Sequence, residues 1–161
     1  MFDYTLGLRT GFDMSEVRRI ICAILGLDDL DETHKRYPGL FISMEDPSHP
    51  IRQEVYSTFL GAPFTSSLYY SMNSRDKDQL WRSERLMAVS AARLAVETDA
   101  LAFMTFELDS LIMRRTDGVL YLYESFGNTW RDPGVISQIP QPWIMTDDEY
   151  EGTPPGGSPH G

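Results

Sequence analysis

An alanine-rich amphipathic segment, residues 76–96, constrains the fold of this chain more than any other part of its sequence. Asp76 and Gln79 have the spacing of a helix N-cap followed three residues later by an amide, a pattern that satisfies free backbone N–H groups. Apolar side chains then recur at helical spacing, and alanines flank them. Because alanine is small, such a helix can approach a neighbouring sheet closely. The segment therefore predicts a long helix that packs on a β-sheet.

The segments on either side of this helix have the patterns of strands. Apolar and polar residues alternate in some of them, and others are short apolar runs. Thr116, Asp117 and Gly118 give the turn signal of a β-hairpin. The expected strands are residues 2–9, 40–44, 67–72, 100–108, 111–115 and 119–124.

A second helix is predicted near the start of the chain. Asp13 and Glu16 have the spacing of a capping box, apolar residues follow at helical spacing, and Gly26 ends the pattern. Residues 51–61 fit either a helix or a strand, and we favour a strand. Residues 126–150 contain three prolines and are expected to be irregular.

The order of these elements predicts an α+β fold. A β-α-β-β-α-β order followed by a hairpin indicates a mainly antiparallel sheet with two helices packed on one face. Its closest common topology is a ferredoxin-like core, here extended by the C-terminal hairpin. The length suits a single domain over residues 1–150. Residues 151–161 are rich in glycine and proline and are expected to form a flexible tail.

The negative charge of the chain is concentrated in its last part. The net charge is −10, and residues 97–161 hold eleven acids against three bases, whereas residues 1–96 hold thirteen acids against eleven bases. Such an imbalance influences solubility and the choice of partner rather than the fold. It argues against nucleic acid, because phosphate binding needs clustered Lys and Arg. It is compatible with a basic partner and equally with a plain soluble surface.

The sequence contains no recognisable catalytic, cofactor or metal-binding set. The single Cys22 lies on the apolar stripe of the first helix and is expected to be buried and inert. One cysteine cannot form a disulfide framework, which fits a reducing cytoplasm. The histidines, at positions 34, 49 and 160, are far apart and fall in expected loops or tail. No apolar run is long enough to span a bilayer, and no signal-peptide pattern follows Met1.

Two carboxylates are the best candidates for catalysis. If the strand at residues 100–108 runs on, Glu107 and Asp109 share one face and perturb each other's pKa, as in carboxylate hydrolases. Acids at a strand end that enters a turn are, however, ordinarily only solvated. We therefore expect no catalytic role and treat these residues as part of a surface that binds a partner.

The expected binding surface combines the C-terminal acids with nearby aromatic residues. Aromatic side chains often anchor interfaces, and acidic runs attract basic proteins and help to reject wrong ones. The residues predicted to contact a partner are Glu107, Asp109, Tyr123, Glu124, Trp130, Asp132, Trp143, Asp147, Asp148 and Glu149.

The final third of the chain resembles a known family. Residues 99–104 lead through 111–115 to Asp117-Gly-Val-Leu-Tyr-Leu, and Trp130-Arg-Asp-Pro and Pro140-Gln-Pro-Trp follow. This order is similar to that of the small cytoplasmic immunity proteins of bacterial polymorphic toxin systems, in particular the swarming-inhibition type of myxobacteria. The opening strand and helix are similar in placement.

The resemblance implies a non-catalytic inhibitor that binds a cognate toxin domain and blocks its active site or substrate path. It transfers no binding residue, because the toxins of such proteins differ. A basic toxin would suit the net charge of −10. Two other hypotheses stay open: a structural or regulatory α+β protein that forms a homodimer or binds another partner, and an enzyme that uses Glu107 and Asp109.

Overall fold

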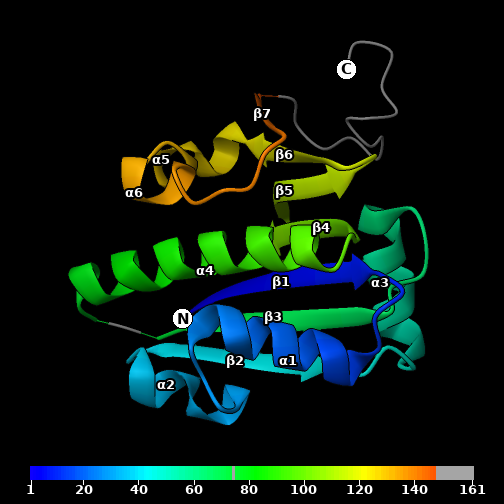
Figure 1. Cartoon of the computed structure of the whole chain (residues 1–161), viewed down its shortest axis with the longest axis horizontal. Helices are drawn as coiled ribbons and strands as arrows, with labels where there is room; N and C mark the ends of the chain where they lie inside the picture. Colours follow the sequence, from blue (N-terminus) through cyan, green and yellow to red (C-terminus); the bar gives the residue numbers. More distant parts are fainter. Residues whose placement is uncertain (74, 148–161) are drawn as a thin grey trace.

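The computed structural model describes residues 1–73 and 75–147, which form one sheet with helices on both faces (Figure 1). Among these residues the sheet has the strand order β2-β3-β1-β4-β5-β6-β7. Neighbouring strands are antiparallel except for β6 and β7, which are parallel. The strands are β1 (Phe2–Arg9), β2 (Leu40–Glu45), β3 (Ser66–Met72), β4 (Leu101–Phe106), β5 (Ser110–Thr116), β6 (Val119–Tyr123) and β7 (Trp143–Thr146).

The predicted α+β class and the ferredoxin-like core are confirmed. The first four strands lie in the order β2-β3-β1-β4, and the hairpin of β5 and β6 extends the sheet beyond β4. Two long helices, α1 (Met14–Leu25) and α4 (Lys77–Glu97), pack against each other on one face of the sheet. The shorter helices are α2 (Thr33–Arg36), α3 (Pro50–Leu60), α5 (Gly127–Trp130) and α6 (Pro133–Ile136), with one-turn 3-10 helices at Leu30–Glu32 (η1) and Glu124–Phe126 (η2).

Local sequence signals explain where the two long helices begin. The Asp13 carboxylate accepts a hydrogen bond from the backbone N–H of Glu16 at 2.9 Å, and the Glu16 carboxylate accepts one from the backbone N–H of Asp13. This is the capping box that the spacing predicts. Asp76 caps α4 through the N–H groups of Asp78 and Gln79. Both helices bury their apolar stripes in the main core, to which β1 contributes Tyr4, Leu6 and Leu8.

Residues 51–61 are helical, so the expected strand there is wrong. The structure places them in α3, which begins at Pro50 after the N-cap His49 and ends at Leu60. The C-cap Gly61 follows with a φ of +77°. Proline in the first turn and glycine just past the end are the sequence signature of a helix. The apolar stripe of α3 is weak because the helix fully buries only Tyr56 and Leu60.

Helix α3 lies on the opposite face of the sheet from α1 and α4. Its buried residues join Phe64, Phe103 and Leu111 in a second, smaller core. The Arg114 guanidinium of β5 donates hydrogen bonds to the carbonyl oxygens of Phe59 and Leu60, the last residues of the helix. These bonds satisfy carbonyls that a helix end leaves free, so they fix the C-terminal end of α3 to the sheet.

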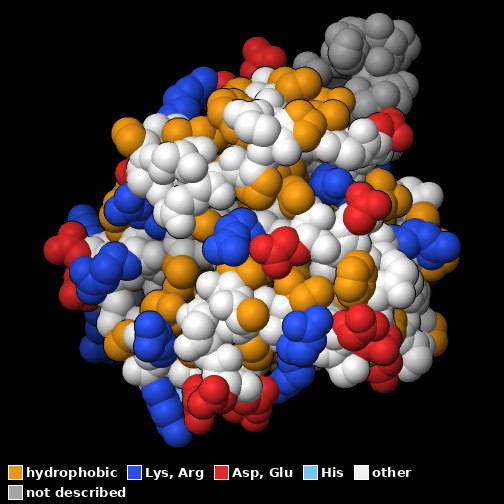
Figure 2. All heavy atoms as spheres, in the orientation of Figure 1, with side chains coloured by type: hydrophobic (Ala, Val, Ile, Leu, Met, Phe, Trp, Pro, Cys, Tyr) orange, Lys and Arg blue, Asp and Glu red, His pale blue; other side chains and the backbone are white. Residues whose placement is uncertain are grey.

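The expectation that residues 126–150 are irregular is also partly wrong. They contain α5, α6 and the edge strand β7, which pairs in parallel with β6. On the face shown in Figure 2, acidic and basic side chains alternate over the lower part, and hydrophobic side chains gather over the upper part near β7. The expected tail at residues 151–161 lies outside the described residues.

Candidate functional site

Three strands end at the same end of the sheet, and each is followed by an acidic residue. Strands β4, β6 and β7 run in the same direction, because β5 is antiparallel to both β4 and β6 and β7 is parallel to β6. The residues that follow them are Glu107, Glu124 and Asp147, and Asp109 lies in the turn after β4. We call these four residues the acidic end of the sheet.

Ion pairs separate the C-terminal acids into two groups. Arginines from α4 reach the first group: Arg85 pairs with Asp132 at 2.8 Å, and Arg93 pairs with Glu97 at 3.4 Å. Asp99 pairs with Arg115 at 3.1 Å, and Glu124 forms a two-bond pair with Arg131. Within the described part of the chain, Glu107, Asp109 and Asp147 of the acidic end have no ion pair. Their charges therefore stay uncompensated by ion pairs at this end of the sheet.

Burial removes two aromatic residues from the expected binding surface. Trp130 is fully buried, and its indole Nε1 donates a hydrogen bond of 2.9 Å to the carbonyl of Ile112. Tyr123 is also buried and belongs to the core beneath α3. The placement of these two residues on a surface is wrong, because amphipathic patterning from sequence does not show which aromatic residue a short helix or strand turns inward. Trp143 is half-buried at the opposite end of the sheet, where β7 begins.

The remaining expected residues fall in different places. Asp132 is the N-cap of α6, where its carboxylate accepts the N–H of Gly134 at 2.9 Å. Asp148 and Glu149 lie outside the described residues, as does His160. Cys22 is buried as expected, and burial raises the pKa of its thiol.

Glu107 and Asp109 are not a carboxylate pair on one strand face. Strand β4 ends at Phe106, and the chain turns back through Glu107 and Leu108, whose φ values are +53° and +55°. The N–H of Asp109 donates to the carbonyl of Phe106 at 3.0 Å and closes the turn. Among the described residues no group of three His, Cys, Asp or Glu is placed to hold a metal ion, and no helix could cross a membrane.

The turn at Leu108 gives a stability prediction. A leucine with a positive φ is uncommon, because its Cβ crowds the backbone, whereas glycine adopts this conformation freely. We expect Leu108→Gly to raise the free energy of unfolding by about 0.5–1 kcal/mol in a denaturant titration. Asp109→Gly, at a position without a positive φ, is the control and should lower stability. Equal effects of both substitutions would contradict the interpretation.

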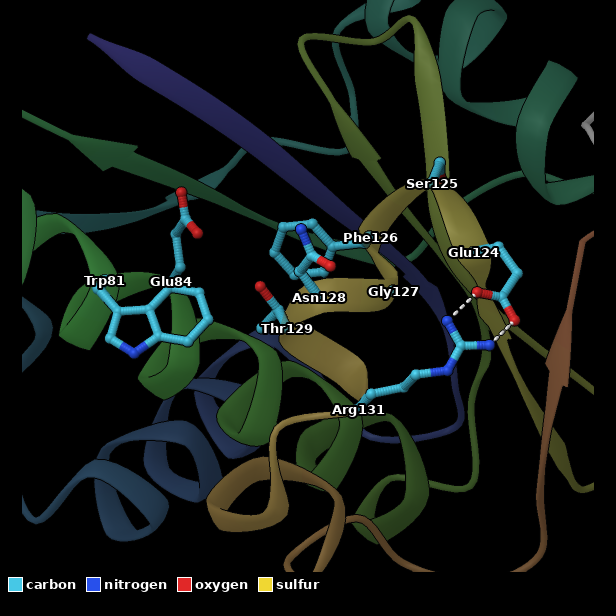
Figure 3. A pocket seen from close by; sticks show the side chains of 9 residues that line it. All are labelled: Trp81, Glu84, Glu124, Ser125, Phe126, Gly127, Asn128, Thr129 and Arg131. Atoms are coloured by element: carbon cyan, nitrogen blue, oxygen red, sulfur yellow. Dashed lines mark hydrogen bonds and ion pairs between the residues drawn. The ribbon is translucent and has the colours of Figure 1, made fainter.

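A small pocket lies beside the acidic end, between α4 and the segment η2–α5 (Figure 3). Its volume is about 310 Å³, and Trp81, Glu84, Glu124, Phe126 and Arg131 are among the residues that line it. Arg131 faces Glu124, whereas the Glu84 carboxylate points away from this pair. Within the described residues Glu84 has no hydrogen-bond or ion-pair partner, and burial raises its pKa. The pocket therefore adds one more uncompensated carboxylate near this end.

A larger groove opens on the α3 side of the sheet. Its volume is about 650 Å³, and it lies between the first turns of α3 and residues of β1, β2 and β3. The turn after β4 forms its rim, so Glu107 belongs both to this groove and to the acidic end. Sequence patterning missed the groove because one of its walls, α3, was expected to be a strand.

Comparison with known proteins identifies one family. The model of the SitI3-like family matches residues 2–133, which is most of the chain. No curated protein and no solved structure matches it. The matched range covers the ferredoxin-like core, the hairpin and the segment through α5. This chain therefore belongs to the SitI3-like family.

Proposed function

We propose that this chain is an immunity protein that binds and neutralises a cognate toxin domain without catalysis, through the acidic end of its sheet. Membership in the SitI3-like family supports this, since SitI proteins are immunity proteins of Sit toxins. The structural observation behind the choice of surface is that Glu107, Asp109 and Asp147 lie at one end of the sheet and form no ion pair with any residue that the structure describes.

The electrostatics of the acidic end favour a basic partner. Uncompensated carboxylates at the ends of strands are held by a rigid scaffold, so their field has a fixed direction. Such a field steers an oppositely charged protein during diffusion and raises the association rate more than it lengthens the life of the complex. A toxin with a basic surface is therefore the partner that this end fits.

A variant with neutral side chains at the acidic end tests this proposal. The partner is the candidate toxin domain encoded beside this chain's gene, and the test variant combines Glu107→Gln, Asp109→Asn and Asp147→Asn. We expect its association rate at low salt to be about tenfold below that of the wild type, and to depend less steeply on salt, because steering is lost. Stopped-flow or surface-plasmon measurements at several salt concentrations give the rates.

The control variant carries the same change in charge elsewhere. Asp28, Glu32 and Asp117 are exposed: the first two lie at or just before η1, which contacts β2 at the far edge of the sheet, and Asp117 lies in the turn between β5 and β6 at the opposite end. Their replacement by Asn or Gln should leave the association rate within twofold. Equal rates for the test and control variants would contradict the choice of surface. Wild-type protein that neither binds the neighbouring domain nor protects cells from it would contradict the function itself.

Self-association is the alternative function. Strands β2 and β7 are the two outer strands of the sheet, and Phe41 of β2 and Ile144 of β7 are exposed. Outer strands can pair with a second copy and so form a dimer. Sedimentation of the isolated chain separates the two proposals, because a stable dimer at low concentration would favour this one.

A further inference from the structure

The groove on the α3 side contains a concentration of exposed aliphatic side chains. Ile51 is 68% exposed, Val55 is 36% exposed and Leu108 is 40% exposed, and all three border this one groove. Leu108 is in addition held at a positive φ, an unfavourable conformation for leucine. Contiguous exposed apolar surface rimmed by polar groups marks a binding site more often than a plain surface. The groove is therefore shaped and lined for contact with another molecule.

Helix α3 leaves this part of the sheet open because it is anchored at its other end. Phe59 stacks on Phe103 with ring centroids 5.2 Å apart, and Arg114 holds the last carbonyls of the helix. The first turns of α3, which carry Ile51 and Val55, face the groove instead of a neighbouring helix. The groove thus has one helical wall and a floor made of three strands.

The lining of the groove is acidic. Asp3 and Glu45 on the floor and Glu107 on the rim contribute carboxylates, and Arg52 is the one guanidinium among the described lining residues. Glu45 is compensated: it lies 3.1 Å from the Nε of Arg52, and it accepts a hydrogen bond of 2.7 Å from the Tyr56 hydroxyl. Asp3 and Glu107 have no ion pair within the described residues, so their charges dominate the groove.

Two features of the groove are consistent with an excess of negative charge there. One carboxylate oxygen of Asp3, Oδ1, is buried without a hydrogen-bond partner among the described residues. The pKa of the nearby Tyr69 is raised to about 12, first by burial and then by a hydrogen bond to Asp3 and the charges of Asp3, Glu45 and Glu107. A cation placed in the groove would offset this excess of negative charge.

We infer that the groove receives a protruding segment of the cognate toxin that carries an arginine or lysine flanked by apolar side chains. The cationic group lies over Asp3 and Glu107, and the apolar side chains pack on Ile51, Val55 and Leu108. This rests on the proposed function and adds to it the chemistry of the toxin segment and the cavity that takes it. An interface with an enclosed central pocket and a polar rim concentrates binding energy in a few residues.

Two pairs of matched variants test the inference with the toxin domain encoded beside this chain's gene. Val55→Arg places a cation in the groove. Thr58→Arg introduces the same cation at an exposed position of α3 outside the groove. We expect Val55→Arg to weaken binding about 100-fold and Thr58→Arg to change it less than threefold, as measured by titration calorimetry. Melting curves of both variants verify that the fold is kept.

The second pair of variants changes two residues outside α3 that have the same backbone conformation. Glu107 and Asp117 have the same φ of +53° in two turns at opposite ends of the sheet. Glu107→Lys should weaken binding at least tenfold, and Asp117→Lys should leave it nearly unchanged.

The outcomes separate the two proposals. If the wild type binds but all four variants bind equally well, the groove is not the docking site and this inference is overturned. Glu107 then also leaves the proposed surface, but the binding of the wild type still supports the immunity function. If the wild type does not bind, the proposed function fails and the inference fails with it. A dimer of the isolated chain that Val55→Arg dissolves would assign the groove to a second copy and would also overturn the inference.

Discussion

Replacing Trp130 with alanine is expected to lower the free energy of unfolding by about 3–5 kcal/mol, the range for removing a large buried aromatic side chain. The side chain is fully buried and packs edge-on against Phe126 with centroids 5.7 Å apart. Its removal also leaves the carbonyl of Ile112 without the indole donor. Urea unfolding followed by circular dichroism measures the loss.

Two further tryptophan variants test whether the loss of stability in Trp130→Ala comes from the burial of this side chain. Trp81 is 37% exposed, so Trp81→Ala should cost less than about 1.5 kcal/mol. Trp130→Phe keeps much of the volume and loses the hydrogen bond to Ile112, so it should be intermediate in stability. We expect Trp130→Phe to bind the toxin domain as tightly as the wild type. If Trp130→Phe loses affinity for the toxin domain without a matching loss of stability, Trp130 contributes to the interface after all.

Replacing Gly7 with alanine is expected to lower the free energy of unfolding by about 2–3 kcal/mol, because it overpacks a filled core. A Cβ atom at Gly7 would lie 2.1 Å from Cε1 and 2.8 Å from Cζ of Phe103. The ring cannot move away easily, since Phe103 is fully buried between Tyr56 and Phe59. Thermal and urea unfolding of the purified variant give the cost.

A double-mutant cycle assigns the cost of Gly7→Ala to this contact. Phe103→Leu alone leaves space and should also destabilise the protein, but Phe103→Leu combined with Gly7→Ala should cost less than the sum. We expect a coupling of about 1–2 kcal/mol, as found for residues in direct contact. Strict additivity would show that Gly7 is required for another reason, such as the backbone of β1.

Local signals in the sequence were sufficient to predict the ferredoxin-like core of the fold. The capping residue Asp13 and the Asp117–Gly118 turn each determine a boundary through their own backbone bonds, and both lie where expected. Helix α3 could not be predicted in the same way. Its apolar residues contact a second core formed by Phe64 and Phe103, which are distant from one another in sequence. Only the folded sheet shows that a helix can bury its side chains there.

The candidate site could be predicted in part. Charge counting pointed to the C-terminal acids, and three of them, Glu107, Asp109 and Asp147, follow strands that end at the same end of the sheet or lie in the turn after one. It could not show that Arg85 of α4 neutralises Asp132, because this pair depends on tertiary packing. Nor could it find Asp3, which lies far from Glu107 in sequence and borders the same groove.

The position of α3 in the chain makes it replaceable. The segment from residue 46 to 65 leaves the sheet at the end of β2 and returns at the start of β3, and these two strands are neighbours. Its length and sequence can therefore change without altering the strand order or the packing of α1 on α4. A scaffold with this connection can acquire a new binding wall by exchanging one segment, provided that the new segment again covers Phe103, while the main core with α1 and α4 is kept.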